Sequence, residues 1–352
     1  MSENIRISII GAGSVGFTQK LVRDILQVPE LQDVEFSLQD ISSKNLDLVK
    51  QLLEKDISAN KIPAKITTSL ERPKALEGAK YIINCSRIGG LSAFKDDIEI
   101  PLKYGIDQCV GDTVCAGGVL YGQRSIPAIL DFCSDINAYS DENALFLNYA
   151  NPMAMNTWAA LTAGNVNTIG LCHGVQGGAR KIAEVLGAGD ESELDYICSG
   201  INHMTWFIEL FFQGRKIIKG ELIEAFKKHP VYSSQEKVRI DVLERFGVFS
   251  TESNGHLSEY LPWYRKRPEE INQWIDLSEW IHGETGGYLR VCTEKRNWFE
   301  EDFPKWLDES GINFSNYKRS TEHCSYIIEA IETGRIYRGH FNTMNKGVVE
   351  NL

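Results

Sequence analysis

The sequence predicts an α/β protein whose first half is a doubly wound parallel sheet. Three observations predict this fold. A β-rich run, 5–10, enters a turn, 11–16, that fits the pattern Gly-x-Gly-x-x-Gly. A second strand-like run ends at Asp40, about where an acidic residue follows such a turn. Strand-like and helix-like stretches then alternate as far as Leu171. This alternation is typical of a Rossmann-like domain.

The chain has 352 residues, more than a single hydrophobic core usually holds. We therefore expect two domains. Residues 1–170 would form the dinucleotide-binding domain, and residues 171–352 would form an α+β domain that binds the substrate and a metal.

Charge and composition narrow the class of protein. The net charge of −11 disfavours binding to nucleic acid or to an anionic membrane surface. No apolar run reaches the ~18 residues of a membrane span, and no basic stretch precedes 5–16 as in a signal peptide. The eight cysteines show no paired spacing, as in reduced proteins. We expect a cytoplasmic protein.

The glycine-rich turn predicts a dinucleotide site. Its glycines allow a tight turn and close approach of the pyrophosphate, and the helix predicted over 17–27 supplies amide donors at its N-terminus. Asp40 would accept a hydrogen bond from a ribose hydroxyl, which favours NAD over NADP. A bare turn is the alternative. The predicted cofactor-binding residues of the turn are Gly11, Gly13, Ser14, Val15 and Gly16.

The following elements continue the alternation of strands and helices. We predict helices over 44–59, 73–78, 118–138 and 153–162, and strands over 65–68, 81–86, 144–150 and 167–171. The carboxyl end of the 81–86 strand should lie on the nicotinamide side of the crevice. Arg87 follows that strand and is added to the cofactor-binding residues.

Two polar positions in this half allow two interpretations each. Asp112, in a loop of small residues, is either an active-site acid or, with Thr113, a cap for the helix after Gly118. Asn151 follows a buried strand, where its amide could bind a sugar hydroxyl. It could also be a turn-forming residue before Pro152. Asn-Pro also occurs at this place in lactate and malate dehydrogenases. It therefore supports the fold rather than any particular reaction.

A thiol and two imidazoles follow the predicted cofactor domain. Cys172 and His173 directly follow the strand predicted over 167–171, and His203 lies thirty residues after His173. Thiolate and imidazole are the ligands that soft-to-borderline divalent metals prefer. We therefore predict that Cys172 and His203 bind a metal. The alternative is that each is an ordinary core residue.

The second half is less informative. Residues 206–211 and 215–218 flank Gln213-Gly214 and predict a hairpin, and 221–245 is helical in pattern. A helix near Tyr260 would place His256 on the same face, four residues away. The alternative is an ordinary amphipathic segment. The rest, to about Gly334, is predicted to be helical.

With these residues in view, the chain resembles glycoside hydrolase family 4, the NAD- and manganese-dependent glycosidases. The Cys172-His173 pair and the run 151–158 resemble its α-galactosidase (melibiase) branch. Gly174 stands where that branch commonly has Ser. The chain also stops at Leu352, so we expect it to lack the family's C-terminal segment. The motifs that carry the resemblance are Gly11–Ser14, Asp112-Thr113, Gly117-Gly118, Asn148–Trp158, Gly170–His173, Gly200–Met204 and His256–Tyr260.

The resemblance implies a redox-neutral elimination and addition. NAD takes a hydride from carbon 3 of the sugar, the proton on carbon 2 is removed, the aglycone leaves carbon 1, and water and hydride return. Mn²⁺ polarises the sugar oxygens. This departs from the usual scheme of two carboxylates.

The resemblance also implies roles for the predicted residues. Cys172 and His203 bind Mn²⁺. His173 is the acid for the leaving oxygen. Tyr260 is the base at carbon 2, with His256 as the alternative base. The remaining roles fall to Asp112, which tunes the base, and to Asn151 and Asn202, which orient hydroxyls.

The substrate would be an α-linked oligosaccharide or glycoside, most simply an α-galactoside, with α-galacturonide and α-glucoside as alternatives. An acidic sugar would need a cation near carbon 6, and Arg87, Arg124 and Arg265 are candidates. The resemblance also implies a homo-oligomer, a dimer or tetramer.

Two other classes of protein remain as alternatives. One is an NAD-dependent hydroxy-acid dehydrogenase, which needs an arginine clamp beside a histidine. The other is a non-catalytic NAD-binding protein.

Overall fold

The computed structural model describes residues 5–189, 191–277, 283–294 and 298–344. Met1–Asn4 and residues 345–352 lie outside this range. The expectation that the chain lacks the family's C-terminal segment rests on residues in this last stretch. The contacts divide the chain into two units. Unit 1 comprises 1–88, 124–172 and 295–352, and unit 2 comprises 89–123 and 173–294. The predicted domains are consecutive, whereas both units are built from separate segments.

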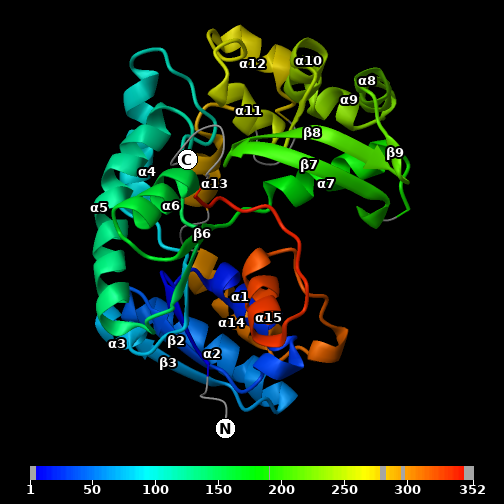
Figure 1. The fold of residues 1–352 in the computed structure, drawn as a ribbon. Coiled ribbons are helices and arrows are strands. Elements are labelled where there is room, and N and C mark those ends of the chain that lie inside the picture. Colours follow the sequence, from blue (N-terminus) through cyan, green and yellow to red (C-terminus); the bar gives the residue numbers. More distant parts are fainter. Residues whose placement is uncertain (1–4, 190, 278–282, 295–297, 345–352) are drawn as a thin grey trace. The chain divides into compact units, whose positions relative to one another are not determined.

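Unit 1 contains a six-stranded sheet in the order β3-β2-β1-β4-β5-β6, and each neighbouring pair is parallel (Figure 1). This order is that of a doubly wound sheet, so the predicted fold class is confirmed. The strands are β1 Arg6–Ile10, β2 Glu35–Gln39, β3 Lys65–Ser69, β4 Tyr81–Asn84, β5 Leu145–Asn148 and β6 Thr168–Gly170.

Helices cover both faces of this sheet. Side chains of α1 (Val15–Leu26), α2 (Ser43–Asn60) and α15 (His323–Thr333) share one buried cluster with β1 and β2. A second cluster joins β4 and β5 to α3, α5 and α6. These helices are α3 Arg72–Leu76, α5 Ala116–Tyr139 and α6 Met153–Thr162. Burial on both faces explains the continuous apolar strands, such as Tyr81–Asn84, that the sequence shows.

The last part of the chain returns to unit 1. In Figure 1, α15 lies beside α1, and α14 (Trp298–Glu309) packs on α2. Buried carboxylates fix this segment: Asp24 accepts hydrogen bonds from the Ser320 amide at 2.9 Å and the Tyr317 hydroxyl at 3.0 Å. Asp56 accepts one from the Gly311 amide at 2.7 Å. Unit 1 is therefore completed by residues far from its sheet in sequence.

Unit 2 is an α+β unit around a small antiparallel sheet in the order β10-β8-β7, with β9 paired to β8. Its strands are β7 Leu194–Ile201, β8 Met204–Phe212, β9 Arg215–Lys216 and β10 Phe249–Ser250. Its helices include α4 Gly90–Leu102, α7 Gly174–Val185, α8 Lys219–Lys228, α9 Tyr232–Gln235, α10 Lys237–Phe246, α11 Asn254–Tyr260, α12 Pro268–Trp274 and α13 Gly287–Glu294. The core lies between α7, α8, α10 and this sheet.

The hairpin predicted at Gln213-Gly214 is confirmed by the pairing of β8 with β9. Two helical predictions need correction. The stretch 221–245 is three helices, because Pro230 cannot donate a helical hydrogen bond and α8 ends at Lys228. Helix α4 was not predicted, because its N-terminal glycines, Gly89 and Gly90, read as a loop and adopt positive φ of 88° and 60°.

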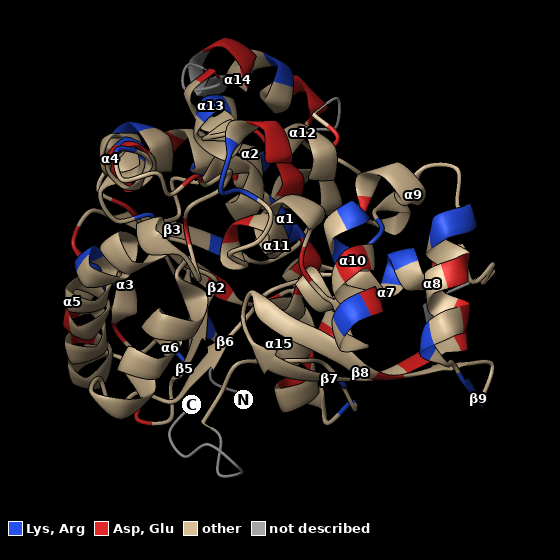
Figure 2. Cartoon of the chain, turned by 90° about the horizontal axis from the view of Figure 1, so that it is seen from above, with Lys and Arg blue, Asp and Glu red and all other residues tan. Residues whose placement is uncertain are grey.

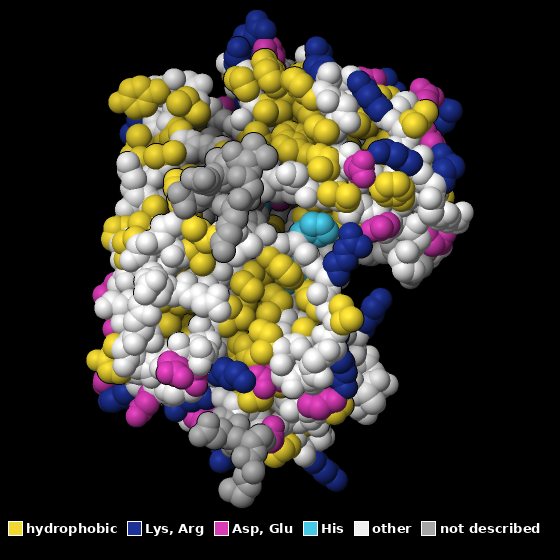
Figure 3. All heavy atoms as spheres, viewed as in Figure 1, with side chains coloured by type: hydrophobic (Ala, Val, Ile, Leu, Met, Phe, Trp, Pro, Cys, Tyr) yellow, Lys and Arg dark blue, Asp and Glu magenta, His cyan; other side chains and the backbone are white. Residues whose placement is uncertain are grey.

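The surface carries both signs of charge. Figure 2 shows basic and acidic residues together on α8, where they are lysines and glutamates, and Lys227 of α8 pairs with Glu244 of α10. On the face shown in Figure 3, hydrophobic side chains are interspersed with polar ones. Within the part of the chain that the structure describes, no helix is long and apolar enough to cross a membrane.

Candidate active site

The glycine-rich turn of unit 1 is built around Asp40. The Gly13 amide donates to Oδ2 of Asp40 at 2.8 Å, and the Ser42 amide donates to Oδ1 at 3.0 Å. A Cβ on Gly13 would lie 2.7 Å from Oδ2 of Asp40, and one on Gly11, at φ +79°, would lie 2.6 Å from the Ser86 backbone. Both positions therefore require glycine, and the carboxylate of Asp40 still has lone pairs for another donor.

The other predicted cofactor residues lie around this turn. Val15 is buried as the first residue of α1, whereas Ser14 precedes the helix and is exposed. A Cβ on Gly16 would meet no atom within 4 Å, so packing does not require glycine there. Arg87 follows β4 and is partly buried.

Asn151 and Cys172 follow the carboxyl ends of β5 and β6 in unit 1, as predicted. Nε2 of His323 lies 3.1 Å from the Cys172 carbonyl oxygen, and Nδ1 lies 2.6 Å from the Tyr337 hydroxyl. A carbonyl only accepts, so Nε2 carries the proton and Tyr337 donates to Nδ1. His323 therefore fixes the backbone of Cys172, a contact that nothing in the sequence indicates.

In unit 2, a two-residue turn between β7 and β8 carries Asn202 and His203, and both are buried. Gly200 lies in β7 two residues before the turn, and its φ is +135°. A Cβ there would lie 2.2 Å from the Met204 carbonyl oxygen. Glycine thus lets the two strands close tightly enough to hold His203 at the end of the sheet.

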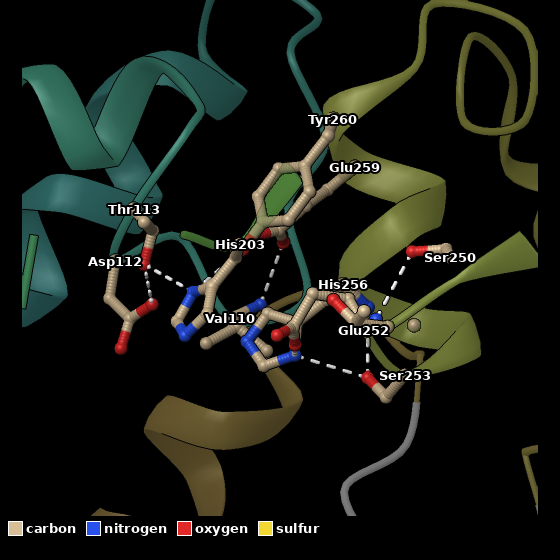
Figure 4. Close-up of polar contacts among 12 residues, drawn as sticks. Val110, Asp112, Thr113, His203, Ser250, Glu252, Ser253, His256, Glu259 and Tyr260 are labelled. Carbon is tan, nitrogen blue, oxygen red and sulfur yellow. Dashed lines mark hydrogen bonds and ion pairs between the residues drawn. The ribbon is translucent and has the colours of Figure 1, made fainter. Parts of the chain in front are cut away.

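A hydrogen-bonded chain orients the ring of His203 (Figure 4). The Thr113 hydroxyl donates to Oδ1 of Asp112 at 2.8 Å, and its oxygen lies 2.8 Å from Nδ1 of His203. Because the hydroxyl proton is given to Asp112, Thr113 accepts the proton of Nδ1. The lone pair of His203 is then on Nε2, which is the form of a metal-binding imidazole.

Burial also keeps His203 neutral. Removal from water lowers the pKa of His203 below its ordinary value, and the neighbouring His256 lowers it further. The carboxylates of Glu252 and Asp112 oppose this shift. Because a metal binds only the neutral imidazole, the lowered pKa favours the metal-binding form.

His256 and Tyr260 lie on one face of α11, as the spacing predicts. The rings of His256 and Tyr260 stack at 5.9 Å, and those of His256 and His203 lie 5.1 Å apart. Nδ1 of His256 is 3.4 Å from a carboxylate oxygen of Glu252. Donor atoms of Asp112, His203 and His256 lie within 4.8 Å of one another, close enough to share one cation.

The Tyr260 hydroxyl lies 3.5 Å from Nδ1 of His203, at the limit of a hydrogen bond. Burial raises the pKa of Tyr260 well above its ordinary value, and the carboxylates of Glu259 and Asp112 raise it further. The phenol therefore keeps its proton at neutral pH unless a cation lies nearby. A Tyr base at this position would therefore need a metal beside it.

Helix α5 begins at Ala116, and two amides of its first turn donate to groups other than Asp112 and Thr113: Gly117 to Oε1 of Gln108 and Gly118 to Sγ of Cys115. Thr113 instead contacts His203. His173 is exposed and precedes α7 as its N-terminal cap position.

Sequence reasoning missed three residues of this site. Thr113 was considered as a cap and as part of a motif, but with no role of its own in the site. Glu252 and Glu259 were not singled out, although Glu252 lies four residues before His256 and Glu259 directly before Tyr260. Glu259 lies inside a motif of the resemblance, and that position was the one available signal. The contact between Thr113 and His203 joins residues ninety positions apart and has no local signature.

Sequence comparison decides the family. The profile of the family 4 glycosyl hydrolases matches residues 6–188, and that of their C-terminal domain matches residues 198–352. The chain belongs to glycosyl hydrolase family 4. The family's C-terminal domain is therefore represented in this chain.

Two relatives of this family 4 chain are alpha-galactosidases. One, from Rhizobium meliloti (strain 1021), is 65% identical over 99% of this chain and 71% of its own length. The other, from Bacillus subtilis (strain 168), is 34% identical over 99% of this chain and 78% of its own length. Alpha-galacturonidases are more distant, such as one from Thermoanaerobacter italicus that is 28% identical over 77% of this chain and 63% of its own length.

Solved structures share the fold. A 6-phospho-alpha-glucosidase from gut microorganisms, in complex with NAD and glucose-6-phosphate, superposes with a TM-score of 0.76 at 20% identity, covering 99% of this chain and 80% of that one. A 6-phospho-beta glucosidase from Thermotoga maritima, with manganese, NAD⁺ and glucose-6-phosphate, gives 0.70 at 22% identity, covering 94% and 74%.

Proposed function

We propose that this family 4 chain hydrolyses α-galactosides with the help of NAD and Mn²⁺. The observation that carries this proposal is the 65% identity, over 99% of the chain, to an alpha-galactosidase. The two features of the chain that would serve this activity are the glycine turn of unit 1 and the polar cluster around His203 in unit 2.

The glycine turn fits a dinucleotide. Because Gly11 and Gly13 carry no Cβ, the turn packs closely against Ser86 and Asp40, and such a tight glycine turn is typical of dinucleotide-binding domains. Asp40 stands at the end of β2 and can accept from a ribose hydroxyl. NAD would be held by this turn and by the N-terminus of α1, with Ser14, Val15, Gly16 and Arg87 around it.

The cluster around His203 fits a divalent metal. Nε2 of His203 presents a lone pair, and the ring is neutral and held by Thr113. We propose His203 and Cys172 as the protein ligands of Mn²⁺. Asp112 and His256 are an alternative ligand set with His203, since their donor atoms lie within 4.8 Å.

NAD would supply a reversible hydride acceptor for carbon 3 of the sugar, and Mn²⁺ would supply a Lewis acid. The residues of the chain would move the protons. Tyr260 would take the proton from carbon 2, and His173 would give a proton to the leaving oxygen. Asn151 and Asn202 would orient sugar hydroxyls, and His256 is the alternative base. Asp112 would tune the base, because its carboxylate raises the pKa of Tyr260.

Two arginines considered for an acidic sugar are engaged elsewhere. Arg265 is buried and binds Asp107 and the Gly283 carbonyl, and Nε of Arg124 donates to the Ile88 carbonyl. The guanidinium of Arg265 is thus already paired with a carboxylate of its own unit. The lower identity to alpha-galacturonidases supports a neutral galactoside over a galacturonide.

We also propose a cytoplasmic location and assembly into a homo-oligomer. All eight cysteines are free, which suits a reducing compartment in which a Cys172 thiolate could serve as a ligand. Fractionation of cells and sedimentation of the purified protein test these two points. Recovery outside the cytoplasm or as a monomer would contradict them.

The function is tested with an aryl α-galactoside, Mn²⁺ and a thiol, with and without NAD⁺, in D₂O. We expect cleavage that requires NAD⁺ and places deuterium at carbon 2 of the galactose. Cleavage that ignores NAD⁺ would overturn the mechanism. Cleavage of the α-galacturonide or α-glucoside alone would overturn the sugar assignment. Net NADH formation with a hydroxy acid would indicate a dehydrogenase, and NAD binding without turnover would indicate a non-catalytic protein.

A further inference from the structure

The Glu259 side chain binds three consecutive backbone amides. Its Oε2 atom accepts hydrogen bonds from the amides of Cys109 at 2.7 Å and Val110 at 2.8 Å, and Oε1 accepts one from the Gly111 amide at 3.0 Å. Figure 4 shows the carboxylate turned towards this loop. Successive amides that point inward form an anion-binding concavity, and here a side chain of the same unit fills it.

The bound loop has a defined shape. Gly111 has a φ of +69°, and a Cβ there would lie 2.4 Å from Cδ1 of Ile98. One residue before the concavity, Gln108 donates to the Asp97 carbonyl and accepts from the Gly117 amide. The loop is thus held against α4 and α5, and Glu259 supplies the attachment to α11.

The loop and the helix that Glu259 joins both carry residues of the candidate site. The loop continues directly into Asp112 and Thr113, which hold Nδ1 of His203. On the other side, Glu259 is followed in α11 by Tyr260. One carboxylate therefore fixes the distance between the residues that orient His203 and the helix that carries the proposed base.

We propose that Glu259 is a positioning residue, which holds the 109–113 loop so that Thr113 orients His203 towards the metal. This inference rests on the proposed function. It assigns Glu259 no contact with the substrate or the metal. Its effect passes through the backbone amides to Thr113 and from there to the imidazole.

The chemistry of the carboxylate explains why a similar side chain would not serve. A carboxylate offers two accepting oxygens, whereas the amide of Gln offers one and turns two N–H donors towards the loop. At least one of the three backbone amides would then face another donor. Asp retains both oxygens but is one methylene shorter, so it would bind the loop only if α11 moved closer.

The test compares E259Q and E259D with a matched control, E270Q. Glu270 also accepts two backbone amides, those of Lys266 and Arg267 at 3.0 and 3.2 Å, but it lies in α12 away from His203. For each variant we would measure Mn²⁺ affinity by EPR titration without substrate, amide exchange at 109–111 without metal, and thermal unfolding.

We expect E259Q to weaken Mn²⁺ binding by about 10–100-fold, the range found when supporting contacts of metal ligands are lost. Exchange at 109–111 should increase, and E259D should fall between E259Q and the parent. E270Q should lose thermal stability but bind Mn²⁺ within about twofold of the parent.

Two results would overturn the proposal: E259Q that loses protection at 109–111 yet binds Mn²⁺ normally, or E270Q that weakens Mn²⁺ binding as much as E259Q does. If E259Q does not fold, the same comparison applies to E259D, whose normal affinity with lost protection would also overturn it. Because these measurements need no glycoside, failure to cleave an α-galactoside would overturn the proposed function and leave this inference standing.

Discussion

Nδ1 of His203 and Oγ1 of Thr113 lie 2.8 Å apart, and the Thr113 hydroxyl donates its hydrogen bond to Asp112. The ring nitrogen of His203 that keeps its lone pair, Nε2, is thus selected by a hydroxyl that lies in another loop. A hydroxyl in this position cannot be replaced by a methyl group without leaving the buried Nδ1 proton unpaired.

The first prediction concerns this hydroxyl. T113V keeps the shape of the side chain but removes the acceptor, so Mn²⁺ affinity should fall by about 10–100-fold in an EPR titration. T113S keeps the hydroxyl and should bind within a few-fold of the parent. Equal affinity of T113V and the parent would mean that Thr113 does not orient the ligand.

The second prediction distinguishes the two ligand sets for the metal. If Cys172 and His203 bind it, the Co²⁺ form should show a thiolate-to-metal charge-transfer band that C172S lacks. C198S, which removes a free thiol from β7, is the control and should keep the band. A band-free Co²⁺ complex that is lost in H256Q or D112N would instead favour Asp112, His203 and His256.

A third prediction uses the different surroundings of two glycines. In G13A the new Cβ would lie 2.7 Å from Oδ2 of Asp40, so either the turn or the Asp40 carboxylate must shift, and NAD⁺ affinity, measured by calorimetry, should fall at least about tenfold. In G16A the Cβ meets no protein atom within 4 Å, so the loss of affinity should be smaller than in G13A. Equal losses in both variants would show that the contact with Asp40 is not what the turn requires.

The fourth prediction concerns stability and pH in the metal-free protein. Burial lowers the folded-state pKa of His203 below 6.5, so the unfolded chain binds its proton first as the pH falls. The contribution of neutral His203 is complete above the unfolded pKa and is lost as the pH falls below it. From about pH 8 to about pH 5, the parent should therefore lose more thermal stability than H203N. Parallel pH curves for the two proteins would contradict this.

A fifth prediction identifies the base at carbon 2. Y260F should abolish the incorporation of deuterium at carbon 2, because a phenyl ring cannot accept a proton, while Mn²⁺ and NAD⁺ still bind. H256Q should slow turnover but retain incorporation. The reverse pattern would assign the base to His256, which stacks on Tyr260.

Local patterns were sufficient for much of the fold. The strands around Ile7, Phe36 and Ile82 are apolar because both faces of the sheet are buried, and the glycine turn carries its own signature. The pairing of His256 with Tyr260 followed from helical spacing. These features depend on residues that are close in sequence.

Tertiary features could not be predicted in the same way. Thr113 meets His203, His323 meets Cys172, and Glu259 meets Cys109 across 90 to 151 residues, with no repeating pattern to indicate them. The division of the chain was also hidden, because the helices after Lys295 pack on α1 and α2 through contacts that only the folded chain brings together.

The return of the chain to unit 1 has a consequence for synthesis on the ribosome. Asp24 and Asp56 are almost fully buried, by groups that include Gly311, Tyr317 and Ser320. Until those residues leave the exit tunnel, both carboxylates and the parts of α1 and α2 that pack on α15 and α14 stay uncovered. Unit 1 is therefore begun first and finished last, and a nascent chain needs protection from aggregation for most of its translation.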